Sequence, residues 1–343
     1  MKTRRIKTIL LFLSTMPFIG IYAQSIYYVS PHASSGGDGS PATPFHIIHE
    51  AVEKARKDKN CTTIYLREGE YILDTPLVLT SADGNDSKEL IIRNYPGEKA
   101  IISSGITLDL KWEKYKNGIM RAAVKGNPVM DMLIVNGDLR SMARYPDYDK
   151  TAVRFNGTSA LATAPERVKK WKCPEGGYLH AMHKHDWGDF HYRITGKNEK
   201  GELQLEGGWQ NNRPMGIHPE NRMVENIFEE LDAPGEWYYD KQEGWLYYYP
   251  LSDENINELV FETPQLKNLI EIAGTSSHPV KNITIEGIEL TQTIRTFMEH
   301  YEPLLRSDWT IYRGGAVIFR GTEKCTLRDC YIHHVGGNGV FFD

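Results

Sequence analysis

The segment 332–339, IHHVGGNG, places two histidines and an asparagine beside a glycine-rich turn. If Ile332 points into a core from a strand, His333 points outward, because side chains alternate along a strand. Outward polar residues beside a turn, here His333, His334 and Asn338, are suited to lining a binding groove. The competing interpretation is that both histidines are ordinary polar turn residues, and we favour it.

A second concentration of imidazole, indole and carboxylate side chains occurs in HKHDWGD. His183, His185 and Trp187 share one face if this segment is a strand. Together with Asp186 and Asp189, the two histidines suggest a metal site, but the spacing fixes no third ligand, so we predict none. Stacking of Trp187 on a ligand ring is the better functional interpretation, and packing within a hairpin is an equally good structural one.

Arg144, in MARYPD, comes just before a turn that is restricted by proline. Its guanidinium has two possible partners: the carboxylate of an acidic ligand, or a carboxylate of the protein itself. An internal ion pair of this kind would fix one part of the chain to another. We favour the internal ion pair.

Short strands and one helix are predicted in the N-terminal third of the chain. Apolar residues at helical spacing in FHIIHEAVEKARKD indicate a helix with one apolar face. Apolar triplets such as LII and AII, separated by turns, suit the stacked coils of a solenoid better than a sandwich. The predicted elements are a helix over 45–58 and strands over 26–29, 63–73, 76–80 and 90–105.

A repeat with an offset of 42 residues relates NITIEGIEL, at 282–290, to KCTLRDCYI, at 324–332. The equivalent apolar pairs are Ile283 with Cys325, Ile285 with Leu327, Ile288 with Cys330 and Leu290 with Ile332. Solenoid repeats span about 20 to 50 residues, so this offset corresponds to one coil plus a loop. We therefore predict a right-handed parallel β-helix, in which both cysteines are small core residues.

Residues 106–265 have few apolar triplets and many Trp and Tyr residues. GEWYYDKQEGWLYYYP (235–250) predicts a hairpin that turns at DKQEG, and LHAMHKHDWGDFHYRI (179–194) predicts a second hairpin. We therefore predict an all-β insertion domain over 106–265. It separates an N-terminal cap with the first coils, 24–105, from further coils at 266–343.

The first 23 residues have the pattern of a secretory signal peptide. Basic residues precede an apolar stretch, and the small Ala23 precedes Gln24, where we predict cleavage. The apolar stretch is interrupted by Ser14 and Pro17, and it is too short to span a membrane. No later segment predicts a membrane span, so we expect a secreted or periplasmic protein.

Charge and composition narrow the range of partners. The 343 residues are 25% charged and 40% hydrophobic, which is typical of globular proteins. Without the four basic residues of the predicted signal peptide, 36 basic and 45 acidic residues remain, a net charge of −9. An acidic exported protein is a poor candidate for binding nucleic acid. No motif indicates a cofactor, and the oligomeric state stays open.

Six segments between residues 26 and 343 form a pattern: IYYVSPHASSGGDGSPATPFHIIHEAVEKAR, TIYLREGEYILDTPLVLT, IIRNYPGEKAIISSG, LIVNGDLRSMARYPD, GEWYYDKQEGWLYYYP and GGNGVFFD. Together they resemble the amino-terminal part of the right-handed β-helix carbohydrate enzymes of glycoside hydrolase family 141. Members of that family include an α-L-fucosidase that acts on plant pectin and a xylanase. The resemblance implies a pectin-lyase-like solenoid and a polysaccharide or oligosaccharide substrate.

Glycosidic hydrolysis uses two carboxyl groups, about 5 Å apart for retention of configuration and further apart for inversion. On a β-helix we expect them to point outward from neighbouring coils, and the candidates are Asp329 and Asp343. Asp329 aligns with Gly287, which favours a turn role, and Asp343 is the last residue, with no coil after it. The resemblance implies that the catalytic carboxylates lie on later coils. We therefore assign no catalytic residue and keep Asp343 only as a candidate for substrate binding.

The sequence ends at VFFD without a turn or a cap, although a terminal coil needs a cap. We therefore expect the chain to be the front part of a longer β-helix, a glycoside hydrolase acting on plant cell-wall polysaccharide. One alternative is a polysaccharide lyase on the same fold, but the clustered acids of a Ca²⁺ site are absent from the sequence. The other is a non-catalytic glycan-binding or structural β-helix.

Overall fold

A computed structural model describes residues 24–59, 61–212, 216–304 and 310–343. The fold is mostly β and contains both parallel and antiparallel sheets, so the all-β prediction is confirmed. The predicted signal peptide, residues 1–23, lies outside the described residues. No helix within the described ranges is long and apolar enough to cross a membrane.

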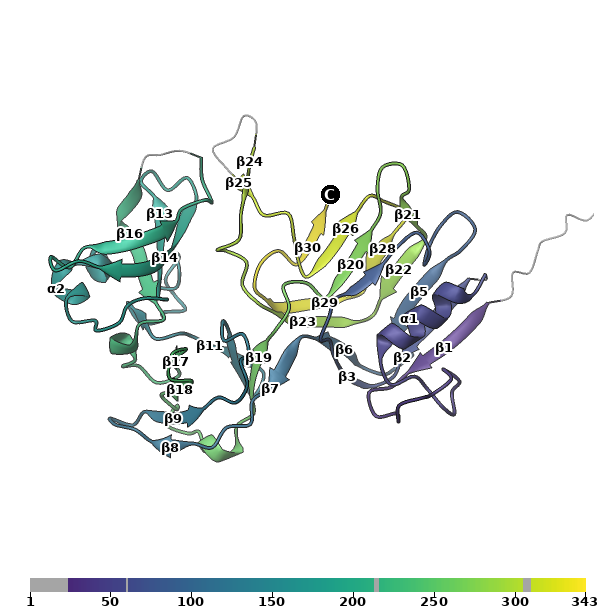
Figure 1. Cartoon of the computed structure of the whole chain (residues 1–343), viewed down its shortest axis with the longest axis horizontal. Coiled ribbons are helices and arrows are strands. Elements are labelled where there is room, and N and C mark those ends of the chain that lie inside the picture. The colour runs from purple at the N-terminus through teal and green to yellow at the C-terminus, as the bar shows by residue number, and fades with distance from the viewer. Residues whose placement is uncertain (1–23, 60, 213–215, 305–309) are drawn as a thin grey trace, which may run out of the picture.

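Three parallel sheets are built from the two ends of the described chain, and we call them the parallel region (Figure 1). The first sheet has the order β1 (Ser25–Val29), β2 (Thr62–Leu66), β5 (Leu90–Asn94), β22 (Ile283–Glu286) and β28 (Thr326–Arg328). The second has the order β3 (Gly69–Ile72), β6 (Ala100–Ser103), β23 (Glu289–Thr293) and β29 (Tyr331–Val335). The third has the order β4 (Leu77–Leu79), β20 (Ile270–Ala273), β26 (Val317–Arg320) and β30 (Val340–Phe342). A short parallel pair joins β21 (Val280–Lys281) to β27 (Thr322–Glu323).

The chain visits the three sheets in the same order on each pass, from the first to the second to the third. Equivalent residues therefore stack in columns, as in the column Ile64, Ile92, Ile285 and Leu327 of the first sheet. The pairing of Ile285 with Leu327, and of Leu290 with Ile332, confirms the offset predicted from the sequence.

One apolar cluster joins the inward faces of all three sheets to the helix α1 (Ile48–Lys57). The buried face of α1 consists of Ile48, Ala51, Val52 and Ala55, as its spacing predicts. The helix begins later than predicted, because Phe45 instead forms a bridge with Val29 of β1. Figure 1 shows α1 beside β1 and β2, at the end of the stack opposite β28.

Cys325 and Cys330 pack against this cluster as partly buried residues, which confirms their interpretation as core residues. Both thiols are free, and the Cys325 Sγ lies 3.5 Å from the Val280 carbonyl oxygen. Burial raises the pKa of both thiols. A thiol held in the neutral form in this way is a weak nucleophile, which fits a structural role.

Residues with a left-handed backbone conformation recur at the same offset along the stack. The equivalent positions, with their φ angles, are Asn282 (57°) with Lys324 (55°), Gly287 (67°) with Asp329 (54°), and Gln292 (59°) with His334 (47°). A Cβ atom on Gly287 would come within 2.2 Å of the Asn94 side chain, so this position has no room for any residue other than glycine. The predicted turn role of Asp329 is confirmed.

Residues 105–264 form three antiparallel sheets, which we call the antiparallel region. One sheet has the order β11 (Asp138–Arg140), β10 (Leu133–Val135), β19 (Phe261–Pro264) and β7 (Gly105–Thr107). Another has the order β17 (Trp237–Asp240), β18 (Trp245–Tyr248), β9 (Met120–Ala123) and β8 (Glu113–Lys114). The largest has the order β12 (Arg144–Tyr145), β16 (Ile217–Glu225), β13 (Tyr178–His183), β14 (Asp189–Lys197) and β15 (Leu203–Gly207). Both predicted hairpins are present, as β17–β18 and β13–β14.

The antiparallel region has several small cores in place of one large one. Trp237 and Tyr248 are fully buried in one of them, and Trp171 is buried in another. Short helical segments complete this region: α2 (Pro165–Val168) and the 3₁₀ turns η1 (Ala160–Thr163), η2 (Phe228–Glu230) and η3 (Ile256–Glu258).

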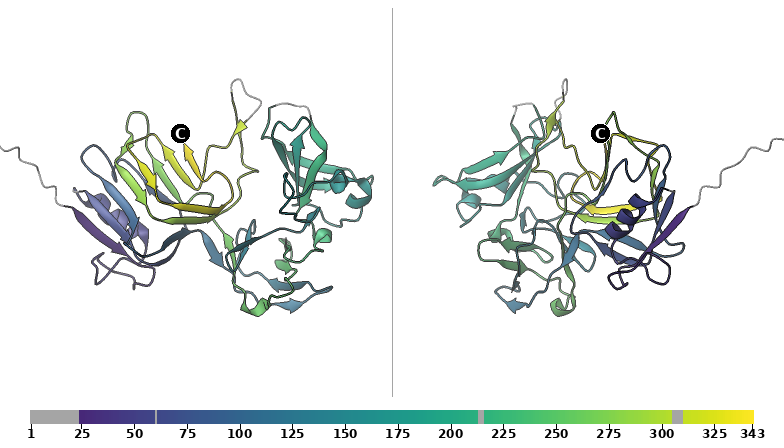
Figure 2. Two further views of the ribbon diagram at one scale, coloured as in Figure 1. Left: turned by 180° about the vertical axis from the view of Figure 1, so that it is seen from behind. Right: turned by 45° about the vertical axis from the view of Figure 1, so that its right-hand side comes forward.

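Two long connections leave the parallel region at the same corner, between its second and third sheets. The antiparallel region connects β6 to β20, and on the next pass the segment 294–316 connects β23 to β26. Because β6 pairs with β23, and β20 pairs with β26, the two connections leave side by side. Figures 1 and 2 show the second connection, with its short pair β24 (Glu302–Pro303) and β25 (Thr310–Ile311), between the two regions.

Candidate functional site

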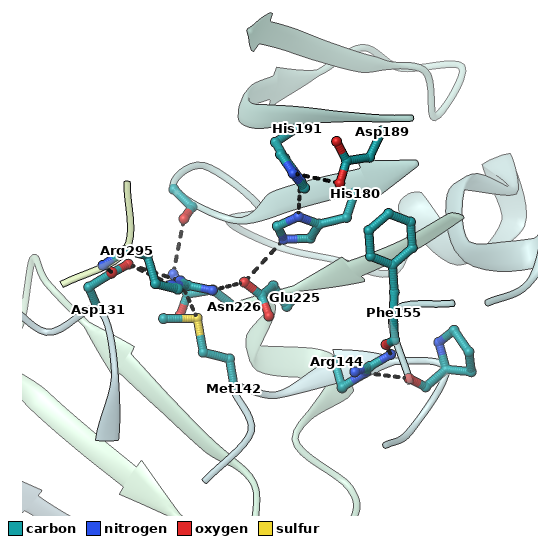
Figure 3. Close-up of polar contacts among 12 residues, drawn as sticks. Asp131, Met142, Arg144, Phe155, His180, Asp189, His191, Glu225, Asn226 and Arg295 are labelled. Carbon is teal, nitrogen blue, oxygen red and sulfur yellow. Dashed lines mark hydrogen bonds and ion pairs between the residues drawn. The ribbon is translucent and has the colours of Figure 1, made fainter. Parts of the chain in front are cut away.

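The segment that follows β23 inserts Arg295 into the antiparallel region, where it meets two carboxylates (Figure 3). Arg295 donates to Asp131 from its backbone N at 2.8 Å, from Nε at 3.1 Å and from Nη2 at 2.9 Å. Its Nη1 forms an ion pair with Oε1 of Glu225, the last residue of β16. Charge-assisted hydrogen bonds to a planar guanidinium are directional. Arg295 therefore fixes the segment after β23 to the antiparallel region.

Glu225 extends this network into the β13–β14 hairpin. His180 Nε2 lies 3.1 Å from Glu225 Oε1, and its Nδ1 lies 2.7 Å from His191 Nδ1. His191 Nε2 in turn lies 3.4 Å from Asp189 Oδ2. Burial is the main cause that lowers the pKa of His180, so its ring is neutral at neutral pH. His180 then donates to Glu225 from Nε2 and accepts from His191 at Nδ1.

Phe297 covers the histidine pair from the side of the parallel region. Its ring centroid lies 5.1 Å from those of Tyr178, His180 and His191. Its backbone oxygen accepts a hydrogen bond from Gln210 Nε2 at 2.7 Å. The two regions are therefore joined by both an ion-pair network and an aromatic contact.

Opposite charges in this network hold each other ionised. Burial by itself raises the pKa of Glu225, but Arg295 and His180 outweigh it and hold the pKa well below its usual range. Burial by itself lowers the pKa of Arg295, but Glu225 and Asp131 outweigh it and hold the pKa above its usual value. Both side chains therefore stay charged over the physiological pH range.

A cavity of about 510 Å³ opens beside Arg295, and we call it the interregion cavity. Its volume falls within the range of small-molecule sites, roughly 300–1,000 Å³. The ionisable residues that line it are Asp131, Arg140, Arg144, Asp147, Glu225, Glu236 and Arg295. Pockets that combine apolar walls with a few convergent polar groups are the usual place for a binding or active site.

Glu236, just before β17, lines this cavity and is only 2% exposed. Its Oε2 accepts long hydrogen bonds from the backbone N–H groups of Asp232, at 3.4 Å, and Ala233, at 3.3 Å. Burial is the main cause that raises the pKa of Glu236 to about 8, and Asp147 and Asp232 add to the increase. The carboxyl group is therefore mostly protonated at neutral pH, and the proton belongs on Oε1, because Oε2 already accepts two N–H groups.

The cavity thus contains one carboxyl group in its acid form, Glu236, and one in its ionised form, Glu225. Environments that push the pKa values of two carboxyl groups apart are characteristic of acid–base sites. The same pair can also act as a hydrogen-bond donor and an acceptor for a ligand rich in hydroxyl groups.

Arg144, in β12, lies in the wall of the cavity, but the predicted internal ion pair is wrong. Its Nε donates to the Pro146 carbonyl oxygen at 2.8 Å, and its Nη2 donates to those of Phe155 and Gly157 at 2.7 and 3.0 Å. Among the described residues, all of its hydrogen-bond acceptors are carbonyl oxygens, and none is a carboxylate. Carbonyl groups of the loop after β12 satisfy this guanidinium instead, and Arg295 has the role of joining the two regions.

His333 points outward from β29 while Ile332 packs against the core, as the alternation predicts. His333 Nε2 lies 2.9 Å from Glu289 Oε1 on the neighbouring β23, and Lys99 pairs with the other oxygen of Glu289 at 2.7 Å. His334 lies in β29 with a left-handed φ of 47°, and burial is the main cause that lowers its pKa. Neither histidine lines the interregion cavity, and both lie in β29 and not in the turn that the competing interpretation predicts.

Asn338 and Asp343 both make structural contacts away from the cavity. Asn338 Nδ2 donates to the Gly314 carbonyl oxygen at 2.8 Å and so supports the end of the segment after β23. Asp343 pairs with Arg313 at 2.5 Å and with Arg320 at 3.0 Å. A role of either residue in substrate binding stays a prediction.

Trp187 lies in the turn between β13 and β14 and is 46% exposed. The strand ends at His183, so strand alternation does not place His183, His185 and Trp187 on one face. The turn nevertheless brings the rings together, with Trp187 stacked on His183 at 5.7 Å and lying 5.6 Å from His185. Asp186 pairs with Arg154 at 2.9 Å. Across the part of the chain that the structure describes, no group of three or more His, Cys, Asp or Glu is arranged to hold a metal ion.

Sequence reasoning missed the three residues that define this site: Arg295, Glu225 and Glu236. Arg295 lies 164 residues from Asp131 and 70 from Glu225, so no local spacing connects them. The hairpin pattern that contains Glu236 predicts packing alone. An isolated glutamate between Gly235 and an alternating aromatic strand is the one signal that could have drawn attention to it.

Comparisons with known proteins identify the fold. No family model matches the chain. A curated relative, "Uncharacterized protein YwoF" of Bacillus subtilis (strain 168), is 34% identical over 88 residues, which is 25% of this chain and 17% of that protein. A solved structure titled "Glycoside hydrolase" aligns with a TM-score of 0.75 at 20% identity, over 92% of this chain and 63% of that one. Another, "The complex structure of XylC with xylose", aligns with a TM-score of 0.44 at 14% identity, over 92% of this chain and 41% of that one.

The chain therefore shares the fold of the first of these structures and spans less than two thirds of its length.

Proposed function

We propose that the chain is the amino-terminal part of a secreted glycoside hydrolase that acts on plant cell-wall polysaccharide, as a fucosidase or a xylanase does. The observation that carries the proposal is the shared fold with the structure titled "Glycoside hydrolase", at a TM-score of 0.75 over 92% of the chain. The six-segment resemblance to glycoside hydrolase family 141 supports it from the sequence. Because the chain spans 63% of that structure, the activity of the whole protein is part of the proposal.

The proposed architecture is a right-handed parallel β-helix that carries an all-β insertion domain over 106–265. The supporting observation is that the chain visits three parallel sheets in one constant order and stacks equivalent apolar residues in register. Such a stack buries each pass on the next and leaves its outer faces available for long polymeric ligands.

Export is proposed from the basic and apolar pattern of the first 23 residues. We expect cleavage between Ala23 and Gln24. Amino-terminal sequencing of the protein recovered outside the cytoplasm tests this: a mature chain that begins at Gln24 supports export, and an intact Met1 in a cytoplasmic fraction contradicts it.

The proposed activity is tested on the chain from Gln24 to Asp343 and on the product of the whole reading frame. Affinity electrophoresis through gels that contain xylan, arabinoxylan or pectin measures binding, and reducing-end assays measure hydrolysis. We expect retardation of the chain by at least one of these polymers and reducing ends from the product of the whole reading frame. Unsaturated uronate products point to a lyase, binding without products points to a non-catalytic module, and no binding to any polymer overturns the proposal.

A further inference from the structure

We infer that the interregion cavity binds an uncharged sugar unit, to which Glu236 donates a hydrogen bond from Oε1. This inference rests on the proposed function and names the kind of glycan residue that the site accepts.

The first step is an unsatisfied polar atom. Buried polar atoms in folded proteins almost always have a hydrogen-bond partner. Glu236 is 2% exposed, and its Oε1 has no partner among the described residues, whereas its Oε2 is occupied by two backbone N–H groups. Because Glu236 lines a cavity large enough for a ligand, an oxygen of that ligand is the partner that Oε1 lacks.

The second step concerns the cations around the cavity. Arg295 is occupied by Asp131 and Glu225, and Arg144 is occupied by backbone carbonyl groups. Arg140 Nη2 donates to Glu254 at 2.8 Å. The carbonyl groups leave the positive charge of Arg144 in place, but the carboxylates of Glu225 and Asp147, which act on it electrostatically, line the same cavity. The carboxylate of an acidic sugar would therefore meet Asp131, Asp147 and Glu225 as like charges, which is unfavourable. The walls therefore favour a neutral ligand.

The third step concerns hydrogen-bonding capacity. Arg140 lines the cavity, and its Nε is buried without a partner in the described part of the chain, so this residue has a second unused donor. The carboxyl groups of Asp147 and Glu225 offer acceptors on the other walls. Sugar hydroxyl groups both donate and accept, so a ring with several hydroxyl groups matches this mixture of donors and acceptors.

The fourth step concerns the mouth of the cavity. Tyr148 lines it and is 54% exposed, with the Arg144 guanidinium 6.0 Å from its ring centroid. A pyranose ring presents C–H groups on one face, and an exposed aromatic ring provides an apolar surface for that face. Stacking on Tyr148 with hydroxyl groups directed toward Glu236 is the arrangement that uses both residues.

The test is isothermal titration of the chain from Gln24 to Asp343 with xylotriose, and with trigalacturonate as an acidic comparator of equal length. In Glu236→Gln the side chain stays neutral and keeps an N–H donor, so we expect binding within about threefold of the wild type. In Glu236→Leu the donor is lost, and we expect binding at least about tenfold weaker, or roughly 1.4 kcal/mol. Glu243→Leu, in the exposed β17–β18 turn, is the matched control and leaves binding unchanged.

Tyr148→Ala keeps the experiment decisive if Glu236→Leu fails to fold, because an exposed side chain contributes little to folding. We expect it to weaken xylotriose binding by about tenfold as well. Xylotriose binding with wild-type affinity in both Glu236→Leu and Tyr148→Ala overturns the inference and leaves the proposed function standing, and so does selective binding of trigalacturonate. No binding of xylotriose, trigalacturonate or any of the polymers above overturns the proposed function itself.

Discussion

The parallel and antiparallel regions keep their polar groups in different places. In the parallel region, one apolar cluster fills the interior, and the charges pair on the outside, as Glu286 does with Arg93 at 3.2 Å and with Arg328 at 2.9 Å. In the antiparallel region, the cores are small and aromatic, and the ionisable side chains of Arg295 and Glu236 lie inside. The parallel region thus acts as a support, and the antiparallel region contains the groups able to recognise a ligand.

This difference agrees with the general relation between local regularity and function. A repeating stack satisfies apolar burial and hydrogen bonding in every pass, so it leaves few polar groups in costly places. Glu236, which is protonated and lacks a partner on Oε1, departs from that rule, and such departures concentrate at binding and catalytic sites. The following predictions test whether the two regions differ in this way, from the largest expected effect to the smallest.

Removal of Arg295 tests the buried charges of the antiparallel region. We expect Arg295→Leu to lower the free energy of unfolding by about 3–5 kcal/mol, because Asp131 and Glu225 are left as uncompensated charges. Six of the seven tryptophans lie within 106–265, so urea unfolding followed by tryptophan fluorescence reports on this region. Arg328→Leu, which removes an exposed pair of the parallel region, is the control, with a loss below about 1 kcal/mol. Equal losses of unfolding free energy in Arg295→Leu and Arg328→Leu contradict the difference between buried and exposed charges in the two regions.

Titration of Glu236 tests the same region through pH. Glu236 ionises near pH 4.5 in the unfolded chain and near 8 in the folded one, so the folded state holds the proton more tightly. The stability from this group is complete below about pH 4.5 and is lost as the pH rises through 8. At 1.36 kcal/mol per pKa unit the loss is at most about 5 kcal/mol, and we expect about 3 because water in the cavity screens part of it.

Glu236→Gln has no proton to lose, so the comparison isolates this group from Asp147, Asp232 and Arg144, which face it. We expect the variant to be less sensitive to pH and more stable than the wild type at pH 9, in urea titrations across pH 4–9. Parallel pH profiles for the two proteins contradict the burial of a neutral carboxyl group.

Truncation of a stacked residue tests the parallel region. Ile285 is fully buried between Ile92 and Leu327, so Ile285→Ala leaves a cavity and should cost at least about 2 kcal/mol, measured by far-ultraviolet circular dichroism during urea unfolding. Ile72→Ala, at an exposed position of β3, is the matched control and should cost less than about 0.5 kcal/mol. A small effect in both variants shows that the column is not the core of the stack.

Substitutions at two equivalent left-handed turns test the 42-residue repeat, and they have the smallest expected effects. Gly287→Ala adds a Cβ atom that meets Asn94, and we expect a loss of about 1–3 kcal/mol. Asp329→Gly, at the equivalent turn of the next pass, relieves a left-handed residue and should stabilise by up to about 1 kcal/mol, as measured by thermal unfolding. If both substitutions change the stability in the same direction, the two positions are not structurally equivalent.

The sequence predicts the parallel region better than the site, and the reason is physical. Residues at equivalent positions of successive passes have the same environment. The core position of Cys325 and the turn position of Asp329 can therefore be predicted from Ile283 and Gly287 alone. The α1 face and the two hairpins follow from local periodicity in the same way.

The candidate site depends on contacts that local periodicity does not encode. Arg295 is separated by 164 residues from the carboxylate that fixes it. Arg144 was expected to pair with a charge and instead donates to carbonyl groups, whose positions depend on how the chain folds after β12. The protonation of Glu236 depends on burial by distant segments, which no residue spacing reveals.

The most direct measurement is a crystal structure of the chain from Gln24 to Asp343 grown with xylotriose. The account predicts a sugar ring in the interregion cavity, stacked on Tyr148 and with a ring or hydroxyl oxygen at hydrogen-bond distance from Glu236 Oε1. A trisaccharide bound elsewhere, such as on the outer face of β29 beside His333, with the cavity filled by water alone, would contradict it.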